Sequence, residues 1–436
     1  MMSETLFPMD EQPGQKKKDA RQLEGGTPRV QIPIRNQVLM MHSDLDSLIP
    51  EDHQVRTVWA FAEKADLSIV KKKIRAVEGH AGRPSSDPRV LLALWLYATL
   101  DGVGSARALE KLCEDHVAYK WICGGNTINH HTLSDFRSNC GELFDALLMD
   151  SVASLRSKGL VTLNRVAHDG VRVRANAGQG SFHRRDTLDR FVEEAREQVE
   201  ALKQEIDEDP AASSLRRKAA RERAARERQE KIAEALRQLP DLEKKRNRSG
   251  EQRRISTTDP DARKIRMADG GWRPAYNVQF TVDAQTAVVI GVDVNNQGSD
   301  GGQLLPAVER IRQAHGICPE EVLADGGFVK KEDIEALSLP PYETTVYAPV
   351  PKSKVKGCSE PYKTQTREIV RWRKRMEMPA SKEIYKQRGA TVELVNAHAR
   401  NRGLQQFPVR GLKKARAVAL LFALTHNLAR MIKLAG

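Results

Sequence analysis

Three acidic residues stand where strands and a helix could bring their side chains together. Asp169 lies in the strand-like run 165–173 and is expected at a strand end, and Asp325 follows the apolar residues of the run 321–328. Glu393 lies in a stretch with a helical pattern. Carboxylates are the ligands that Mg²⁺ prefers, and paired divalent ions can activate a water or a sugar hydroxyl for in-line attack on a phosphodiester. The three residues therefore indicate metal-dependent chemistry on a nucleic-acid backbone.

Each of these residues alone has an ordinary explanation. Asp-Gly pairs are common in turns, so Asp169 before Gly170 and Asp325 before Gly326 could be turn residues. Glu393 could be a solvated helix residue. A glycine after a metal-binding aspartate would, however, let the backbone approach the ions closely. The apolar residues before each aspartate also suit the carboxyl edge of a sheet, where functional sites collect.

The helical stretch 385–402 favours Glu393 over two rival glutamates as the third carboxylate. Arg400 follows Glu393 by two helical turns, so the two residues share a helix face. That face would hold one metal ligand and one phosphate contact. A tyrosine and an arginine also precede Glu393. The rivals are Glu377 and Glu383, and the preceding residues are Tyr385 and Arg388.

The composition limits the class of protein. A chain of 436 residues usually has more than one domain and can bury a sizeable core. A formal net charge of +13, with arginines in clusters, favours a nucleic-acid partner. No run approaches the roughly 18 uncharged apolar residues of a membrane span, and the N-terminus lacks a signal-peptide pattern. We therefore expect a cytoplasmic protein that binds no membrane.

The first part of the chain divides into a tail and a helical region. Residues 1–40 are polar and are predicted to be a disordered tail. Residues 41–160 have helical periodicity and are predicted to form an N-terminal domain, with Ser105 as one N-cap. The helices around 105–140 could form a DNA-binding helix-turn-helix element. The alternative is an ordinary small helical bundle.

Residues 186–254 form a charged insertion. Apolar residues spaced four and three apart from Leu188 to Ile206 predict a heptad seam. Pro210 can start a second, arginine-rich helix that ends near Pro240. The simplest structure is a helical hairpin with an acidic and a basic arm. Either the basic arm binds phosphates, or the two arms neutralise each other as a solvated coiled coil.

The remainder, within a predicted catalytic domain at 161–436, has strand patterns. Together with the strand around Asp169, these strands suit a mixed sheet with helices packed on it, interrupted by the hairpin after its first strand. Residues 350–383 are lysine-rich and predicted as a loop, and 417–431 as a final helix. The predicted strands are 276–282, 287–294, 322–324 and 345–348, with a helix at 304–314.

Two further residues have two interpretations each, and a third has one. Asp300 is interpreted as a cap for the following helix, with support of the acidic site as the alternative. Trp272 is interpreted as a hydrophobic anchor for a loop, although it could stack on a base at a DNA end. His168 is expected to point away from Asp169, to the opposite face of a regular strand, and to pack there.

A series of short blocks resembles bacterial insertion-sequence transposases of the DDE type. No single block is specific to this family. The order and spacing of the blocks, from about Asp44 to Lys433, are specific to it. The blocks are Gly82-Arg83-Pro84, Asp87-Pro88, HTLSDFR at 131–137, the Asp169 strand, TDPDAR at 258–263, YNVQ at 276–279, ADGG at 324–327, Tyr385 to Glu393, Arg402-Gly403 and RGL at 410–412.

The resemblance implies an α/β fold with all-α additions: a ribonuclease-H-like mixed sheet, an N-terminal helical domain and a helical-hairpin insertion. It implies cleavage at the ends of an insertion sequence and joining of the freed ends to target DNA. Asp169, Asp325 and Glu393 would hold two Mg²⁺ ions, for which Mn²⁺ substitutes. Double-stranded DNA, both transposon ends and target, would be the partner of a homodimer.

In related transposases the helix of the catalytic glutamate also contacts DNA. Here the usual lysine is Arg400 and the usual aromatic residue is Asn396, and arginine does not simply replace lysine at a fixed site. A structure-selective nuclease of the same fold and an inactive DNA-binding remnant are the alternatives, and the intact acidic triad argues against the second. The residues implied to contact DNA are Tyr385, Arg388, Arg400, Arg402, Arg410 and Lys413.

Overall fold

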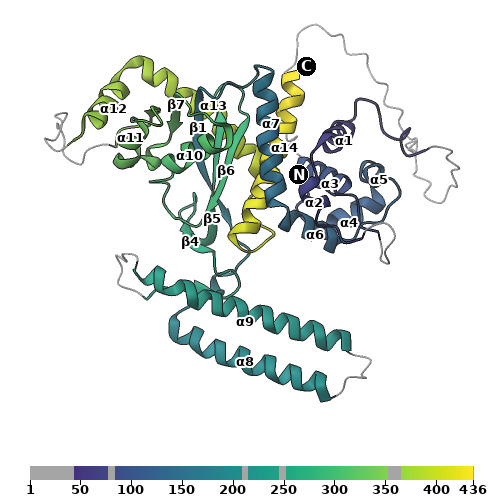
Figure 1. Cartoon of the computed structure of the whole chain (residues 1–436). Helices are drawn as coiled ribbons and strands as arrows, with labels where there is room; N and C mark the ends of the chain where they lie inside the picture. Colours follow the sequence, from purple (N-terminus) through teal and green to yellow (C-terminus); the bar gives the residue numbers. More distant parts are fainter. Residues whose placement is uncertain (1–43, 77–83, 209–214, 245–251, 352–364, 436) are drawn as a thin grey trace, which may run out of the picture. The chain divides into compact units, whose positions relative to one another are not determined.

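The computed structural model describes residues 44–76, 84–208, 215–244, 252–351 and 365–435 (Figure 1). The predicted disordered tail lies outside these residues. Contacts join Leu45–Gly436 into one compact unit. The domain limits expected near residue 160 stay predictions, because helices from both sides of that position pack on the same C-terminal helix.

A mixed sheet with the order β6-β5-β1-β7-β8 lies at the centre of the catalytic region. The β6–β5 and β5–β1 pairs are antiparallel, whereas β1–β7 and β7–β8 are parallel. This is the order of a ribonuclease-H-like core, as predicted. A short strand, β4 (Arg263–Arg266), pairs with the first residues of β5. The strands are β1 Arg165–Arg174, β5 Trp272–Asp283, β6 Val289–Asn295, β7 Glu321–Ala324 and β8 Thr345–Tyr347.

Successive residues of the central strands enter two different apolar cores, because side chains alternate across a strand. Val166 belongs to the core that includes residues of α10 (Leu304–His315), α11 (Lys331–Leu337) and α12 (Arg367–Glu377). Ala167 belongs to the larger core, with residues of α13 and α14. These two helices span Pro379–Asn401 and Leu412–Ala435.

The prediction of a loop at 350–383 is wrong for the second half of that range. Arg367–Glu377 forms α12, and α13 begins at Pro379. Ile369 and Trp372 are buried on one side of α12, a 3-residue spacing that the dense charges of this stretch obscure in the sequence. Residues 352–364 lie outside the described residues.

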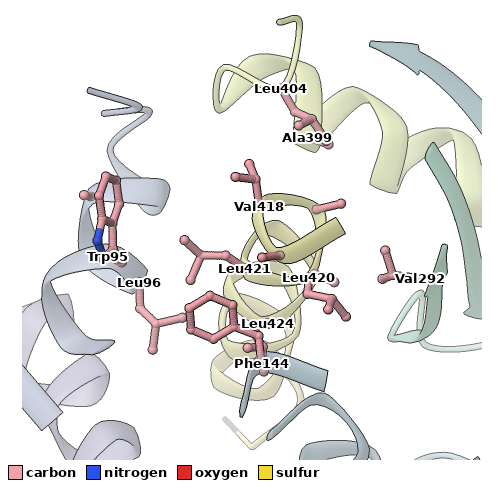
Figure 2. Close-up of a cluster of buried hydrophobic side chains, with 14 of the residues drawn as sticks. Trp95, Leu96, Phe144, Val292, Ala399, Leu404, Val418, Leu420, Leu421 and Leu424 are labelled. Atoms are coloured by element: carbon pink, nitrogen blue, oxygen red, sulfur yellow. The ribbon is translucent and has the colours of Figure 1, made fainter. Parts of the chain in front are cut away.

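Helix α14 organises the larger core. Figure 2 shows Leu420, Leu421 and Leu424 of α14 between Phe144 on one side and Val292 of the sheet on the other. The helix is long and apolar enough to cross a membrane, but 61% of the segment is buried inside the fold. Its apolar side chains therefore pack against α7, β6, α3 and α6.

Seven helices precede β1 in the described part of the chain. Asp87 caps α3 by accepting a hydrogen bond from Arg89 N, with Pro88 at the first helical position. Ser105 caps α4 as predicted, accepting from Ala108 N at 3.3 Å. The helices are α1 Gln54–Lys64, α2 Ser68–Lys71, α3 Pro88–Leu100, α4 Ala106–Asp115, α5 Val117–Cys123, α6 His130–Asn139 and α7 Gly141–Ser157.

The insertion after β1 is a helical hairpin of α8 (Arg185–Glu208) and α9 (Leu215–Lys244) (Figure 1). Its seam buries Leu188, Ala195 and Val199 of α8, together with Ile232, Ala235 and Leu239 of α9. Helix α9 continues through Pro240, where the sequence predicted an end. Strands β2 (Phe182–His183) and β3 (Ile255–Ser256) pair at the base of the hairpin.

Ion pairs of α9 lie mostly within that arm of the hairpin. Arg226 pairs with Glu222 and Lys231 with Glu227, each within one helical turn. One pair, Arg185 with Glu243, joins the two arms at 2.8 Å. Neutralisation between the arms is therefore a small part of the charge balance in the described residues.

Candidate active site

The parallel pairing of β1 with β7 brings Asp169 and Asp325 side by side. The last paired residues are His168 and Ala324, and the two aspartates follow them directly. The expectation that Asp169 ends its strand is wrong. Strand β1 continues to Arg174 because β5 pairs with it on the other side. At Asp169, therefore, the pairing of β1 with β7 has ended, while its pairing with β5 continues.

Helix α13 lies across β1, and two of its polar side chains contact Asp169. Asn396 Nδ2 donates to Asp169 Oδ2 at 3.0 Å. A guanidinium nitrogen of Arg388 lies 3.1 Å from the same oxygen, and another lies 3.1 Å from Glu393 Oε1. Arg388 therefore joins Asp169 to Glu393, although those two residues are far apart in the chain.

Burial and charge act against each other at this site. The side chain of Asp169 is 16% exposed, and that of Glu393 is 58% exposed. Burial raises the pKa of Asp169 above its usual value, Arg388 opposes this, and the charge of Asp325 adds to it. Burial also raises the pKa of Tyr385, and all three carboxylates add to that rise. Tyr385 and Arg388 thus belong to the acidic site itself.

The opposite face of β1 holds a second polar group. Asp300 Oδ1 accepts hydrogen bonds from Asn277 Nδ2 at 2.6 Å and from Gln279 Nε2 at 3.1 Å. A Cβ on Gly170 would lie 2.8 Å from this carboxylate oxygen and 2.7 Å from Gln279 Nε2. Gly170 is therefore required beside Asp169 because Asp300 and the two amides occupy the space of a side chain.

The interpretation of Asp300 as a helix cap is wrong. Helix α10 begins at Leu304 with Gln303 as its N-cap, and no side chain caps it. The Asp300 carboxylate instead lies beside Gly170, and 4.0 Å from the position of a Cβ on Gly327. It thus supports the segments that follow both aspartates of the site.

His168 packs on the face opposite Asp169, as expected. It is 1% exposed, its Nδ1 lies 2.8 Å from Thr281 Oγ1, and its ring meets Phe328 edge-on. Burial lowers the pKa of His168 to about 3. The imidazole is therefore neutral at physiological pH and contributes packing rather than charge.

The other residues implied to contact DNA lie outside the acidic cluster. Arg400, Arg410 and Lys413 are exposed, whereas Arg402 is half-buried. Trp272, at the start of β5, is 61% exposed. Its interpretation as a hydrophobic anchor is therefore wrong.

Nearby acidic residues have structural partners. Asp259 is fully buried and accepts hydrogen bonds from Tyr276 Oη at 2.7 Å and from Gly411 N at 3.1 Å. Asp261 Oδ2 accepts from Leu412 N at 2.9 Å. These carboxylates hold the first residues of α14, where a helix has unpaired N–H groups. The TDPDAR and RGL blocks are therefore structural partners of each other.

Two functional features escaped the sequence analysis. Asn396 appeared only as a departure from an aromatic position, yet it binds Asp169. Asn277 and Gln279 are buried polar residues two apart in β5, on the face that carries Asp300. Alternating buried amides in an otherwise apolar strand are a signal that points to such a polar cluster.

The donor set fits a hard divalent cation in its chemistry. Carboxylate and amide oxygens suit Mg²⁺, and Asn396 Oδ1 is buried without a hydrogen-bond partner. As the side chains stand, the described residues contain no group of three His, Cys, Asp or Glu side chains able to hold one ion together. Arg388 supplies the positive charge between Asp169 and Glu393 in this arrangement.

Two family models match the chain. A model described as Transposase domain (DUF772) matches residues 43–139, and one described as Transposase DDE domain matches residues 244–428. The second match includes Asp325 and Glu393, and Asp169 precedes it. No curated protein and no solved structure matches the chain.

The two matches together span most of the chain. The transposase N-terminal domain comes first and the DDE domain follows it. The DDE domain carries out DNA cleavage and strand transfer, and the family generally uses a divalent metal. The ribonuclease-H-like sheet is the fold on which this chemistry is expected. The chain belongs to the DDE transposases of insertion sequences.

Proposed function

We propose that Asp169, Asp325 and Glu393 are the catalytic carboxylates of this transposase and hold two Mg²⁺ ions, for which Mn²⁺ substitutes. The observation that carries the proposal is the strand register, which puts Asp169 beside Asp325. Arg388 then links Asp169 to Glu393 of α13. Bound ions would lower the pKa of the attacking water or 3′-hydroxyl and stabilise the leaving oxygen.

The protein's own residues prepare this site. Asp169 is held by Asn396 from α13, which limits the directions in which its carboxylate can point. Glu393 is more exposed and sits on a helix, so its longer side chain can adjust toward a ligand. Arg388 offsets part of the charge repulsion among the carboxylates, and thereby keeps Asp169 more readily ionised.

DNA is the substrate, and we propose that the exposed Arg400, Arg410 and Lys413 contact its phosphates. Such contacts position a duplex without reading its sequence. Joining two ends to one target requires both ends in one complex, so we propose a homodimer on DNA, acting in the cytoplasm.

The test is cleavage and joining of labelled duplexes that carry the DNA ends flanking the gene. Wild type is compared with Asp169→Asn, Asp325→Asn and Glu393→Gln, with Mg²⁺, Mn²⁺ or a chelator. We expect metal-dependent 3′-end cutting and joining by wild type alone. Cutting by Glu393→Gln at the wild-type rate would remove Glu393 from the site, and cutting without joining would indicate a nuclease.

A further inference from the structure

A cavity of about 470 Å³ lies between the helices that precede β1 and the segment that follows α13. Gly403, which lines the cavity, packs against a second turn: a Cβ on Gly403 would lie 3.6 Å from Gly102 O. Arg107, Arg137 and Arg402 line it, and no Asp or Glu of the described residues does. The cavity is thus strongly electropositive.

Arg137, the last residue of the HTLSDFR block, is a buried cation that pairs with no carboxylate of the described residues. It is 5% exposed, its guanidinium lies 4.1 Å from the centre of the Trp95 ring, and it donates to Gly104 O at 2.5 Å. Its Nε has no hydrogen-bond partner. Burial lowers the pKa of Arg137 to about 10, which reflects the unfavourable desolvation of its charge.

Arg402 reaches the same cavity from the end of α13. It is half-buried, and the described residues offer it no carboxylate within ion-pair distance. Burial lowers the pKa of Arg402 as well. Two guanidinium groups without counter-charges therefore line one cavity, which is the arrangement that a tetrahedral anion would neutralise.

The start of α4 adds hydrogen-bond donors to the cavity. Ser105, Ala106 and Arg107 line it, and α4 has ten residues. The first N–H groups of a helix have no partner within the helix and attract anions. Ser105 Oγ accepts the N–H of Ala108, and Ala106 and Arg107, which carry the first two N–H groups of the helix, line the cavity.

We propose that this cavity binds a phosphate group, with Arg137 and Arg402 as its cationic contacts and the start of α4 as its amide contacts. The group is a phosphodiester of the transposon-end DNA. The inference deepens the DNA-binding role and rests on the transposase function, but it does not depend on which carboxylates are catalytic.

The place of the cavity relates it to the acidic site. Arg402 follows Glu393 by nine positions, on and just beyond α13. Nine residues of helix span about 13 Å, which corresponds to about four steps of one DNA strand at roughly 3.4 Å each. For a DNA strand that runs along α13, a phosphate held by Arg402 would lie about four nucleotides from the bond that is cut.

The test measures binding of the labelled end duplex by the full chain as a function of salt. Arg137→Gln and Arg402→Gln should each weaken binding roughly tenfold, the cost of losing a hydrogen bond to a charged group. Each substitution should also reduce the magnitude of the salt slope, the slope of log binding constant against log salt concentration, by about one. Arg312→Gln, at an exposed arginine of α10 that pairs with Glu309 and does not line the cavity, is the matched control and should change affinity and salt slope by less.

Two further arms locate the phosphate and identify its source. Single methylphosphonates along the end duplex should weaken wild-type binding at one position about four nucleotides from the cut, and should have no such effect on Arg402→Gln. Inorganic phosphate is compared with chloride at matched ionic strength. Thermal stabilisation of wild type by phosphate, with no methylphosphonate effect, would mean that free phosphate rather than DNA occupies the site.

The outcomes separate this proposal from the catalytic one. Asp169→Asn should bind the end duplex with wild-type affinity and salt slope but not cut it, whereas Arg137→Gln and Arg402→Gln should bind it more weakly and with a lower salt slope. Arg137→Lys keeps the charge but loses the guanidinium fork, so it should keep the wild-type salt slope while binding the end duplex more weakly. Wild-type affinity and salt slope in folded Arg402→Gln and Arg137→Lys/Arg402→Gln would overturn the proposal.

Discussion

Asp169 and Asp325 are neighbours because His168 and Ala324 form the last pair of the parallel β1–β7 ladder. Each aspartate is the first residue beyond that pair, so the register of two strands places both carboxylates at one edge. A shift of the register by one residue would turn every later side chain to the other face of the sheet. The acidic site therefore depends on strand pairing as much as on the residues themselves.

Removal of single carboxylates should stop the reaction without unfolding the protein. Asp325→Asn and Glu393→Gln change exposed side chains, so thermal unfolding should shift little. Cleavage should fall by more than the roughly 10- to 100-fold that loss of an outer-shell partner of a metal costs. Glu383→Gln is the matched control, because Glu383 lies on the same helix and pairs only with Lys386 in the described structure.

Substitution of Arg388 by Gln should move the acid limb of the pH–rate profile to higher pH. Asp169 must be ionised to act, and its pKa is already raised by burial. Arg388 lowers that pKa, so its removal raises it further, and activity is lost at a higher pH as the solution is acidified. Single-turnover cleavage at saturating DNA across a pH series measures the shift. An unchanged acid limb would show that Asp169 does not control it.

Substitution of Gly170 by Ala should damage both packing and activity. The new Cβ would lie within 2.8 Å of Asp300, Asn277 and Gln279, and forcing a methyl group into such a space costs about 1–3 kcal/mol. Because Gly170 follows Asp169 directly, the carboxylate should also move and cleavage should fall. Gly178→Ala, where nothing lies within 4 Å of the new Cβ, should change neither the unfolding free energy nor cleavage by as much.

Substitution of Asp259 by Ala should destabilise the fold more than substitution by Asn. Ala leaves Tyr276 Oη and Gly411 N without an acceptor, and each buried unpaired group costs about 1–3 kcal/mol. Asn keeps an oxygen for both donors. Chemical denaturation of the two variants at neutral pH measures the difference, and equal unfolding free energies would exclude this role for Asp259.

The difference in stability between Asp259→Asn and wild type should depend on pH. Burial raises the pKa of Asp259 in the folded state. Its contribution to stability is therefore fully present below its unfolded pKa and is lost as pH rises through the folded pKa. Asn does not titrate, so the stability of Asp259→Asn relative to wild type should increase over that pH range. A constant difference would contradict the raised pKa.

Local patterns identified most elements of the catalytic core. The strands at 276–282, 287–294 and 322–324 and the helix at 304–314 appear within a few residues of their predicted limits. Apolar alternation and helical periodicity are properties of neighbouring residues, so they can be read without the fold. The exception is α12, where charged residues on the exposed face conceal a narrow apolar stripe.

The sequence by itself determined which residues could carry the chemistry: two aspartates after apolar strands, a glutamate on a helix, and a basic chain around them. Only the tertiary structure decided what surrounds them. Arg388 between Asp169 and Glu393, Asp300 in place of a side chain on Gly170, and Asn396 on Asp169 all join segments far apart in the chain. Such contacts follow from strand register and helix packing, which depend on the simultaneous burial of both cores and cannot be read from any one segment.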